Sequence, residues 1–184
     1  MTYSFSLTLS HVGYFVTDVD KMVDFYTRVL KFVESDRGSR EDNGAIVFLT
    51  RDPKEHHQLV FASGRPEKID FSIVNQISLR VDSLKTLRDL FFTQQKEPIQ
   101  KMLGAITHGN AISVYFLDPE GNRVELLIDT HWYVPQPHRH SIDITLPDDQ
   151  IWAYVEAHCR STPGFTLAET WRAEITQKIK AATL

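Results

Sequence analysis

Hydrophobic and polar positions near the N-terminus change from a strand pattern to a helix pattern. Every second residue is apolar at Val12, Tyr14 and Val16, which is the period of a half-buried β-strand. Apolar residues between positions 22 and 30 then recur at the three- and four-residue spacing of a helix. Asp18 lies between the two patterns and is a predicted helix N-cap. The sequence therefore predicts a strand, a turn and an amphipathic helix.

The same order of patterns begins again about 65 residues later, as expected of an internal repeat. Residues 74–81, VNQISLRV, alternate as a strand, and apolar residues of 84–91 share one helical face. Asp82-Ser83 is the predicted cap between them. This repeat predicts an α+β fold of two tandem βαβββ modules, over about residues 6–63 and 71–131.

The second halves of the two modules match as well, because each holds an apolar strand, an Asp-Pro turn and a further strand. The turns are Asp52-Pro53 and Asp118-Pro119. Each helix must cover one face of its sheet, which leaves the other face to the polar positions. Together the modules make up residues 1–131 and are expected to form one cup-shaped mixed sheet around a central cavity.

Three polar residues are expected to point into that cavity. His11 begins the first strand of one module, Gln76 begins the first strand of the other, and Glu125 stands between two apolar residues in the last strand. A single histidine on a strand is more often a packed core residue than a ligand. The repeat and the carboxylate together favour a metal site. Strand parity predicts a cavity lining of Phe15, Val47, Leu49 and Ile112.

Residues 132–184 form a tail beyond the repeat. The segment HWYVPQPH is expected to be extended because its prolines block a helix. Asp148 or Asp149 is a predicted cap for a helix with Ile151 and Val155 on one face. A last helix carries an apolar stripe at Leu167, Trp171, Ile175 and Ile179. A stripe that includes tryptophan needs a partner surface, so a homodimer is expected.

Composition narrows the class of protein. A net charge of −4 argues against nucleic acid or an anionic membrane as the main partner, since both require clustered Lys and Arg. The single cysteine, Cys159, excludes an internal disulfide and fits a reducing compartment. No apolar run approaches the about 20 residues of a membrane span. We expect a cytoplasmic protein.

Two segments resemble the vicinal oxygen chelate superfamily: HVGYFVTDVDKMVDFYTRVLKF and YFLDPEGNRVEL. That superfamily includes glyoxalase I, bleomycin- and fosfomycin-resistance proteins and type I extradiol dioxygenases. The resemblance covers about residues 8–131 and implies paired βαβββ modules around a divalent metal. Local features are most similar to small extradiol dioxygenase-like proteins.

The resemblance implies that His11, Gln76 and Glu125 are the metal ligands. Extradiol enzymes carry histidine at the position of Gln76, so the amide is either a ligand of altered character or the mark of a lost metal. Counting along the repeat places Leu59 or Val60 opposite Glu125, which argues against a fourth ligand. A set of one nitrogen and two oxygen ligands suits Fe(II), Mn(II), Zn(II) or Mg(II) without strong preference. The resemblance to extradiol enzymes implies Fe(II).

The resemblance also assigns residues beside the metal. His57 matches a proton-shuttling histidine, and Tyr115 and His108 match residues that contact substrate. The alternatives are an exposed histidine for His57 and a packing aromatic for Tyr115.

The implied function is a metal-dependent, extradiol-dioxygenase-like enzyme that cleaves or oxidises a small aromatic diol with dioxygen. Two alternatives stay open. One is a non-redox glyoxalase- or isomerase-type metalloenzyme. The other is a non-catalytic protein that binds an aromatic or drug-like ligand at a degenerate metal site.

His131, His138 and His140 resemble a metal-binding cluster by composition. Pro135 and Pro137 enforce no regular spacing between them, so the segment is interpreted as a capping or interface loop.

Overall fold

A computed structural model of the chain describes residues 7–72, 74–97 and 101–182. The first module comprises β1 (Val12–Val16), α1 (Val19–Arg28), β2 (Val33–Ser39), β3 (Ala45–Thr50) and β4 (Leu59–Ser63). The second comprises β5 (Ile77–Arg80), α2 (Leu84–Gln95), β6 (Met102–Thr107), β7 (Ala111–Leu117) and β8 (Arg123–Asp129). The tail comprises β9 (Trp132–Tyr133), β10 (His140–Ser141), α3 (Asp148–Ser161), β11 (Thr166–Leu167) and α4 (Ala168–Ala182).

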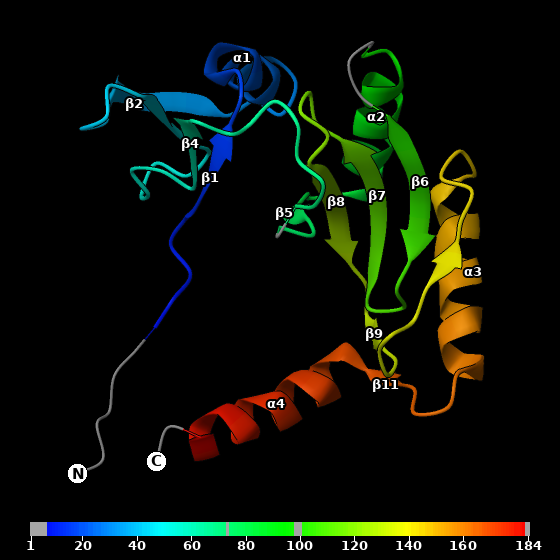
Figure 1. Cartoon of the computed structure of the whole chain (residues 1–184). Helices are drawn as coiled ribbons and strands as arrows, with labels where there is room; N and C mark the ends of the chain where they lie inside the picture. The colour runs from blue at the N-terminus through cyan, green and yellow to red at the C-terminus, as the bar shows by residue number, and fades with distance from the viewer. Residues whose placement is uncertain (1–6, 73, 98–100, 183–184) are drawn as a thin grey trace.

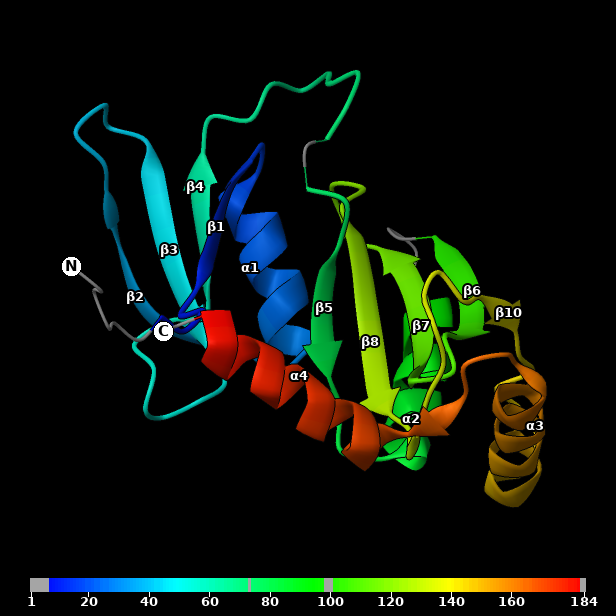
Figure 2. The ribbon, with the colours of Figure 1, turned by 90° about the horizontal axis from the view of Figure 1, so that it is seen from below.

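The two modules have the same strand arrangement in two separate sheets. The order is β1-β4-β3-β2 in the first sheet and β10-β6-β7-β8-β5 in the second. In each module the first strand runs parallel to the last, and the remaining pairs are antiparallel. β1 and β5 are the inner edge strands of the two sheets, as Figure 2 shows. The predicted α+β fold of tandem βαβββ modules with a helical tail is confirmed.

The strand registers show how closely the modules repeat. Gly13 pairs with Val60 in the first sheet, and Ser78 pairs with Glu125 in the second. The two pairs are related by one shift of 65 residues (13 to 78, 60 to 125). Val60 therefore takes the position of Glu125 in the first module, and only the second module carries a carboxylate there.

Both module helices begin at the predicted caps. The Asp18 carboxylate accepts from the Lys21 backbone N–H at 3.0 Å, and the Ser83 hydroxyl accepts from that of Thr86 at 3.0 Å. These bonds satisfy backbone donors that the first helical turn leaves unpaired. α1 and α2 then pack on their own sheets at the same end of the molecule (Figure 1).

One hydrophobic core joins the modules. The Phe25 ring of α1 lies 6.2 Å from the Phe116 ring of β7, and buried side chains of α3 belong to the same cluster. Burial of this apolar surface is the main force that holds the two sheets together.

The turn after β7 docks on the start of α1. The Glu120 carboxylate accepts from the backbone N–H groups of Thr17 and Asp18 at 2.7–2.9 Å. Arg65 donates to Glu120 at 3.3 Å and to Asn122 at 2.9 Å. A turn of the second module thus places negative charge at the helix N-terminus of the first, where the helix dipole stabilises it.

α3 runs along the outer side of the second sheet, beyond β6 (Figure 1). The prediction that Asp148 or Asp149 caps this helix is wrong. Pro147 is the N-cap and makes no side-chain cap bond, while both aspartates lie in the first turn. Asp148 instead accepts from Arg88 of α2 at 2.7 Å. This ion pair attaches the tail to the second module.

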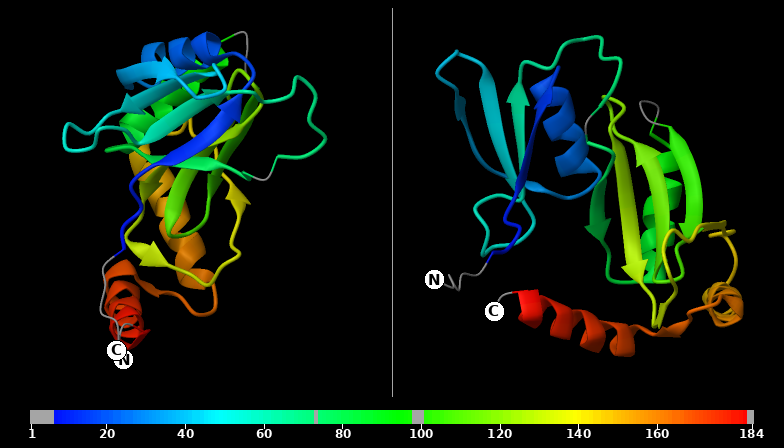
Figure 3. Two further views of the ribbon diagram at one scale, coloured as in Figure 1. Left: turned by 60° about the vertical axis from the view of Figure 1, so that its left-hand side comes forward. Right: turned by 60° about the horizontal axis from the view of Figure 1, so that its bottom comes forward.

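α4 extends away from α3 and lies apart from both sheets (Figures 1 and 3). Trp171 stacks on Tyr133 at a ring distance of 5.2 Å, whereas Leu167 remains 49% exposed. The apolar stripe is thus only partly covered within the chain. Within the described ranges, no helix combines the length and the apolar character that crossing a membrane requires.

Candidate functional site

A buried carboxylate is the centre of the candidate site. Glu125 is only 5% exposed, and strand register places Ser78 of β5 and Tyr115 of β7 on either side of it. All three side chains share the sheet face opposite α2, because residues at the same register point the same way. The flanking residues of β8 point to the core, so the alternation of apolar and polar residues aims this carboxylate away from α2.

Three donors hold the Glu125 carboxylate. The Tyr115 hydroxyl donates to Oε1 at 2.5 Å, the Gln76 amide donates to Oε2 at 2.7 Å, and the Ser78 hydroxyl donates to the same Oε2. A carboxylate taken from water requires such partners. Burial and, after it, the contact with Glu125 raise the pKa of Tyr115, so that side chain remains a phenol.

The hydrogen-bonded series continues from Tyr115 to His108. His108 Nε2 lies 2.8 Å from the Tyr115 hydroxyl, and His108 Nδ1 lies 2.8 Å from the His138 carbonyl oxygen. The carbonyl can only accept, so Nδ1 carries a hydrogen. The phenol has a single hydrogen for two neighbours. Both contacts are therefore hydrogen bonds only when Glu125 or His108 Nε2 holds one further proton.

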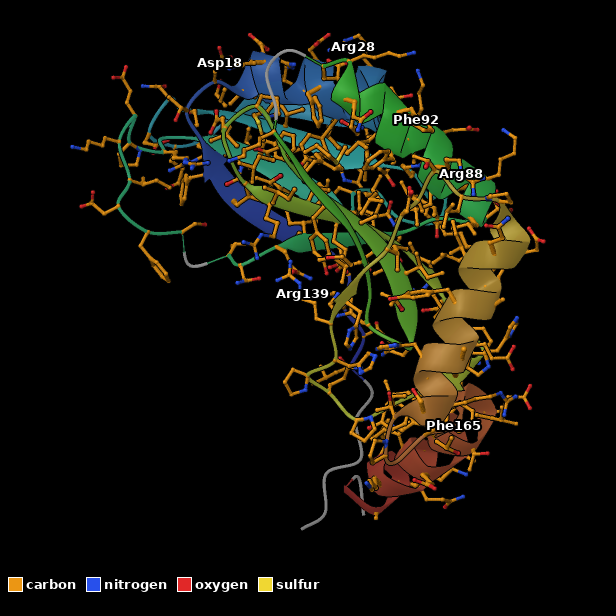
Figure 4. The ribbon with its side chains drawn as sticks, turned by 90° about the vertical axis from the view of Figure 1, so that its right-hand side faces the viewer. Asp18, Arg28, Arg88, Phe92, Arg139 and Phe165 are labelled. Carbon is orange, nitrogen blue, oxygen red and sulfur yellow. The ribbon has the colours of Figure 1, made fainter. Side chains whose placement is uncertain are left out.

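This series opens on a cavity of about 340 Å³. Its lining residues are Gln76, Leu103, His108, Tyr115, Arg123 and Arg139. Arg139 lies on the face of the second sheet opposite α2, as Figure 4 shows. Two guanidinium groups in one small cavity attract an anionic ligand.

A larger cavity, of about 840 Å³, lies between β1 and β5. It is lined on one side by residues 9–12, which include His11, and on the other by residues 77–82, which include Ser78. Because Ser78 also donates to Glu125, this cavity adjoins the carboxylate cluster.

His11 and His57 lie together in the first module. Their ring centroids are 4.2 Å apart, and His57 Nδ1 lies 2.9 Å from His56 Nδ1. Burial, followed by the neighbouring rings of His11 and His56, lowers the pKa of His57. In the part of the chain that the structure describes, His11, His57 and Glu125 form no group with all ligand atoms within 4.8 Å of one another. The structure thus joins Gln76, Glu125, Tyr115 and His108, and separately joins His11 to His57.

The sequence matches the glyoxalase/bleomycin resistance protein/dioxygenase superfamily over residues 8–126. The chain belongs to this superfamily. The match spans both modules and stops inside β8, so the tail lies outside it. The resemblance stated from the sequence motifs is confirmed.

One relative from this superfamily is biphenyl-2,3-diol 1,2-dioxygenase 3 of Rhodococcus globerulus, which is 30% identical over 92 residues. The aligned segment is 48% of each protein, so the chain spans about half the length of the curated relative it matches.

Two solved structures show the superfamily fold. The fosfomycin resistance protein FosX of Listeria monocytogenes, complexed with Mn(II) and sulfate, has a TM-score of 0.55 at 16% identity over 68% of this chain and 95% of that one. A glyoxylase/bleomycin resistance protein/dioxygenase domain from Frankia sp. EAN1pec has a TM-score of 0.55 at 19% identity over 68% and 100% of the two chains.

The sequence analysis did not predict three residues of the site: Ser78, Arg123 and Arg139. Ser78 had a signal, because it follows Gln76 by two residues and so shares its strand face. Arg139 had none, since it lies in an irregular segment between prolines and β10. The predicted lining of Val47, Leu49 and Ile112 is wrong: all three are fully buried in the core. Phe15, the fourth, is 54% exposed beneath Arg40.

Proposed function

We propose that this chain is a metal-dependent enzyme that acts on a small aromatic diol of the catechol type, with dioxygen as the second substrate. The observation that carries the proposal is the series Glu125–Tyr115–His108 beside a cavity with two arginines. The name of the Rhodococcus relative, a diol dioxygenase, supports the same substrate class.

The proposed metal ligands are His11, Gln76 and Glu125. Gln76 and Glu125 suit this role because their side-chain ends lie 2.7 Å apart, and a half-turn of the amide presents its oxygen to a cation. We expect His11 to complete the set from its place just before β1, where it lines the larger cavity that Ser78 also borders. When bound, Fe(II) supplies a Lewis acid for the diol oxygens and a binding place for dioxygen.

The surrounding side chains have distinct tasks in this proposal. Arg123 and Arg139 attract the diol as its anion. His57, whose pKa is lowered, stays neutral near pH 7 and accepts a proton from a diol hydroxyl. Tyr115 stays protonated and turns its hydrogen from Glu125 to a diol oxygen when substrate binds, while His108 holds the phenol oxygen in place.

A second candidate is a non-redox metalloenzyme for a small anionic substrate. The two arginines suit it as well, because a guanidinium pair attracts any small anion and not only a diol anion. The FosX neighbour, complexed with Mn(II), is a fosfomycin resistance protein of this fold.

Anaerobic loading with Fe(II), followed by a panel of substituted catechols and air, separates the candidates. Ring fission gives a yellow product and consumes one dioxygen per diol. Gln76→His should raise Fe(II) affinity by about 10–100-fold and raise ring cleavage, because imidazole is the stronger donor. Asn75→His is the matched control and should change neither.

Two outcomes overturn the diol proposal. Absence of ring fission in both the wild type and Gln76→His across the panel favours the non-redox candidate. Fe(II) content that is unchanged by Glu125→Gln rejects the proposed set of metal ligands. The cavity would then serve only to bind a small molecule.

A further inference from the structure

Three histidines from the tail meet outside the candidate site. They are His138 in the segment after β9, His140 in β10 and His158 in α3, and one ring nitrogen of each lies within 4.8 Å of the other two. The His140 and His158 ring centroids are 3.8 Å apart, and that of His138 lies 4.7 and 5.4 Å from them. β10 and α3 adjoin at the outer edge of the second sheet (Figure 2). Of the three histidines grouped by composition, His131 lies elsewhere, against Trp132 and Trp152.

His138 has an unsatisfied ring nitrogen. Its side chain is buried, at 9% exposure, and its Nε2 has no hydrogen-bond partner among the described residues. A buried nitrogen without a partner is unfavourable, so such a group calls for a ligand. The His138 main chain is otherwise engaged: its N–H donates to Gln136 and its carbonyl accepts from His108.

The cluster favours neutral imidazoles. Burial, and then the neighbouring histidines, lower the pKa of His138 and of His158. Neutral imidazole is the form that coordinates a metal, so the lowered pKa values of these two residues agree with a metal site whose geometry the three rings already provide.

We propose that His138, His140 and His158 bind a zinc ion that fastens the segment after β9 to α3. Three imidazoles suit Zn(II), which accepts tetrahedral coordination without demanding a particular ligand geometry. His140 and His158 are partly exposed, so water can fill the fourth position. One ion would then join residues from a loop, a strand and a helix, in addition to the pairing of β10 with β6 and the ion pair between Arg88 and Asp148.

The zinc site also touches the proposed function. The His138 carbonyl holds His108, and Arg139, between two of the ligands, lines the 340 Å³ cavity. Zinc would therefore position His108 and Arg139 beside the substrate. This consequence rests on the function proposed above, whereas zinc binding itself does not.

The test uses full-length protein without an affinity tag, stripped with a chelator. Glu125→Gln weakens the candidate catalytic ligand set by replacing its one charged ligand, so the tightly bound metal that the variant retains reports the histidine cluster. The Glu125→Gln variant should bind one Zn(II) and show a higher melting temperature with zinc. When Co(II) replaces zinc, the variant should give the strong visible absorption of four-coordinate Co(II). Adding His158→Gln should weaken Zn(II) binding by at least about 10–100-fold, because an amide is a weaker donor than the imidazole it replaces. His131→Gln, at an exposed histidine nearby, should leave binding unchanged.

The proposal is overturned if Glu125→Gln binds no Zn(II), or if adding His158→Gln leaves the affinity intact. X-ray absorption of zinc-loaded Glu125→Gln provides a measurement that needs no second variant: three imidazole ligands support the site, and fewer than three reject it. In otherwise wild-type protein, His158→Gln tests the link to function. Slower turnover with Fe(II) content unchanged supports the positioning role, and unaltered turnover rejects that role while leaving the zinc site in place.

Discussion

Replacing Glu120 with alanine should destabilise the docking of the second module on α1. The carboxylate accepts from the backbone N–H groups of Thr17 and Asp18 at 2.7–2.9 Å, and Arg65 pairs with it at 3.3 Å. Its side chain is only 8% exposed, so these bonds are shielded from solvent. Glu120→Ala removes all of them at once.

The magnitude follows from the partners left behind. Hydrogen bonds to a charged group contribute about 1.5–3 kcal/mol each. Water can rehydrate the exposed Thr17 and Asp18 amides, and Arg65 keeps its bond to Asn122, so the summed loss should be about 2–4 kcal/mol. For a chain of this size the melting temperature should fall by about 4–16 °C. Glu120→Gln keeps one acceptor but no charge and should lose about half as much.

Urea unfolding followed by tryptophan fluorescence measures this loss as a shift of the midpoint at constant slope. Glu41→Ala, at an exposed position in the turn between β2 and β3, is the matched control and should stay within about 0.5 kcal/mol of the wild type. An equally small change for Glu120→Ala would refute the view that this carboxylate joins the modules.

Two further predictions concern the tail. Cys159 is fully buried, and burial raises its pKa. The folded protein should therefore not react with a thiol reagent, and unfolding in urea should make one thiol reactive. Fast reaction of the native protein contradicts this. Because the unfolded thiol ionises first, at about pH 8.5, stability should fall as pH rises above that value, and Cys159→Ala should reduce this slope. The predicted homodimer should use the partly exposed apolar stripe that starts at Leu167 in β11 and continues along α4, so Leu167→Glu should convert the dimer to a monomer in light scattering. A wild type that is monomeric at all concentrations disproves the dimer.

Local patterns in the sequence were sufficient for the elements and their order. The alternating strands and the helix caps depend on neighbours in the chain, and each is present in the structure: strands at Val12–Val16 and Ile77–Arg80, and caps at Asp18 and Ser83. The 65-residue repeat is visible because these local patterns occur twice. The hydrogen bond between Gln76 and Glu125, by contrast, joins residues 49 apart and depends on the parallel register of β5 with β8.

Contacts between distant segments were decided only by tertiary structure. The sequence predicts only a turn at Asp118-Pro119, yet Glu120, the next residue, binds the start of α1 more than 100 residues earlier in the chain. The histidines 138 and 140 gain their third partner from α3, and Arg139 gains a place in the cavity. No periodicity in the sequence predicts these contacts, because they depend on how the sheets and the tail pack. Packing is decided by the apolar surface that the whole core buries, and not by the order of residues along the chain.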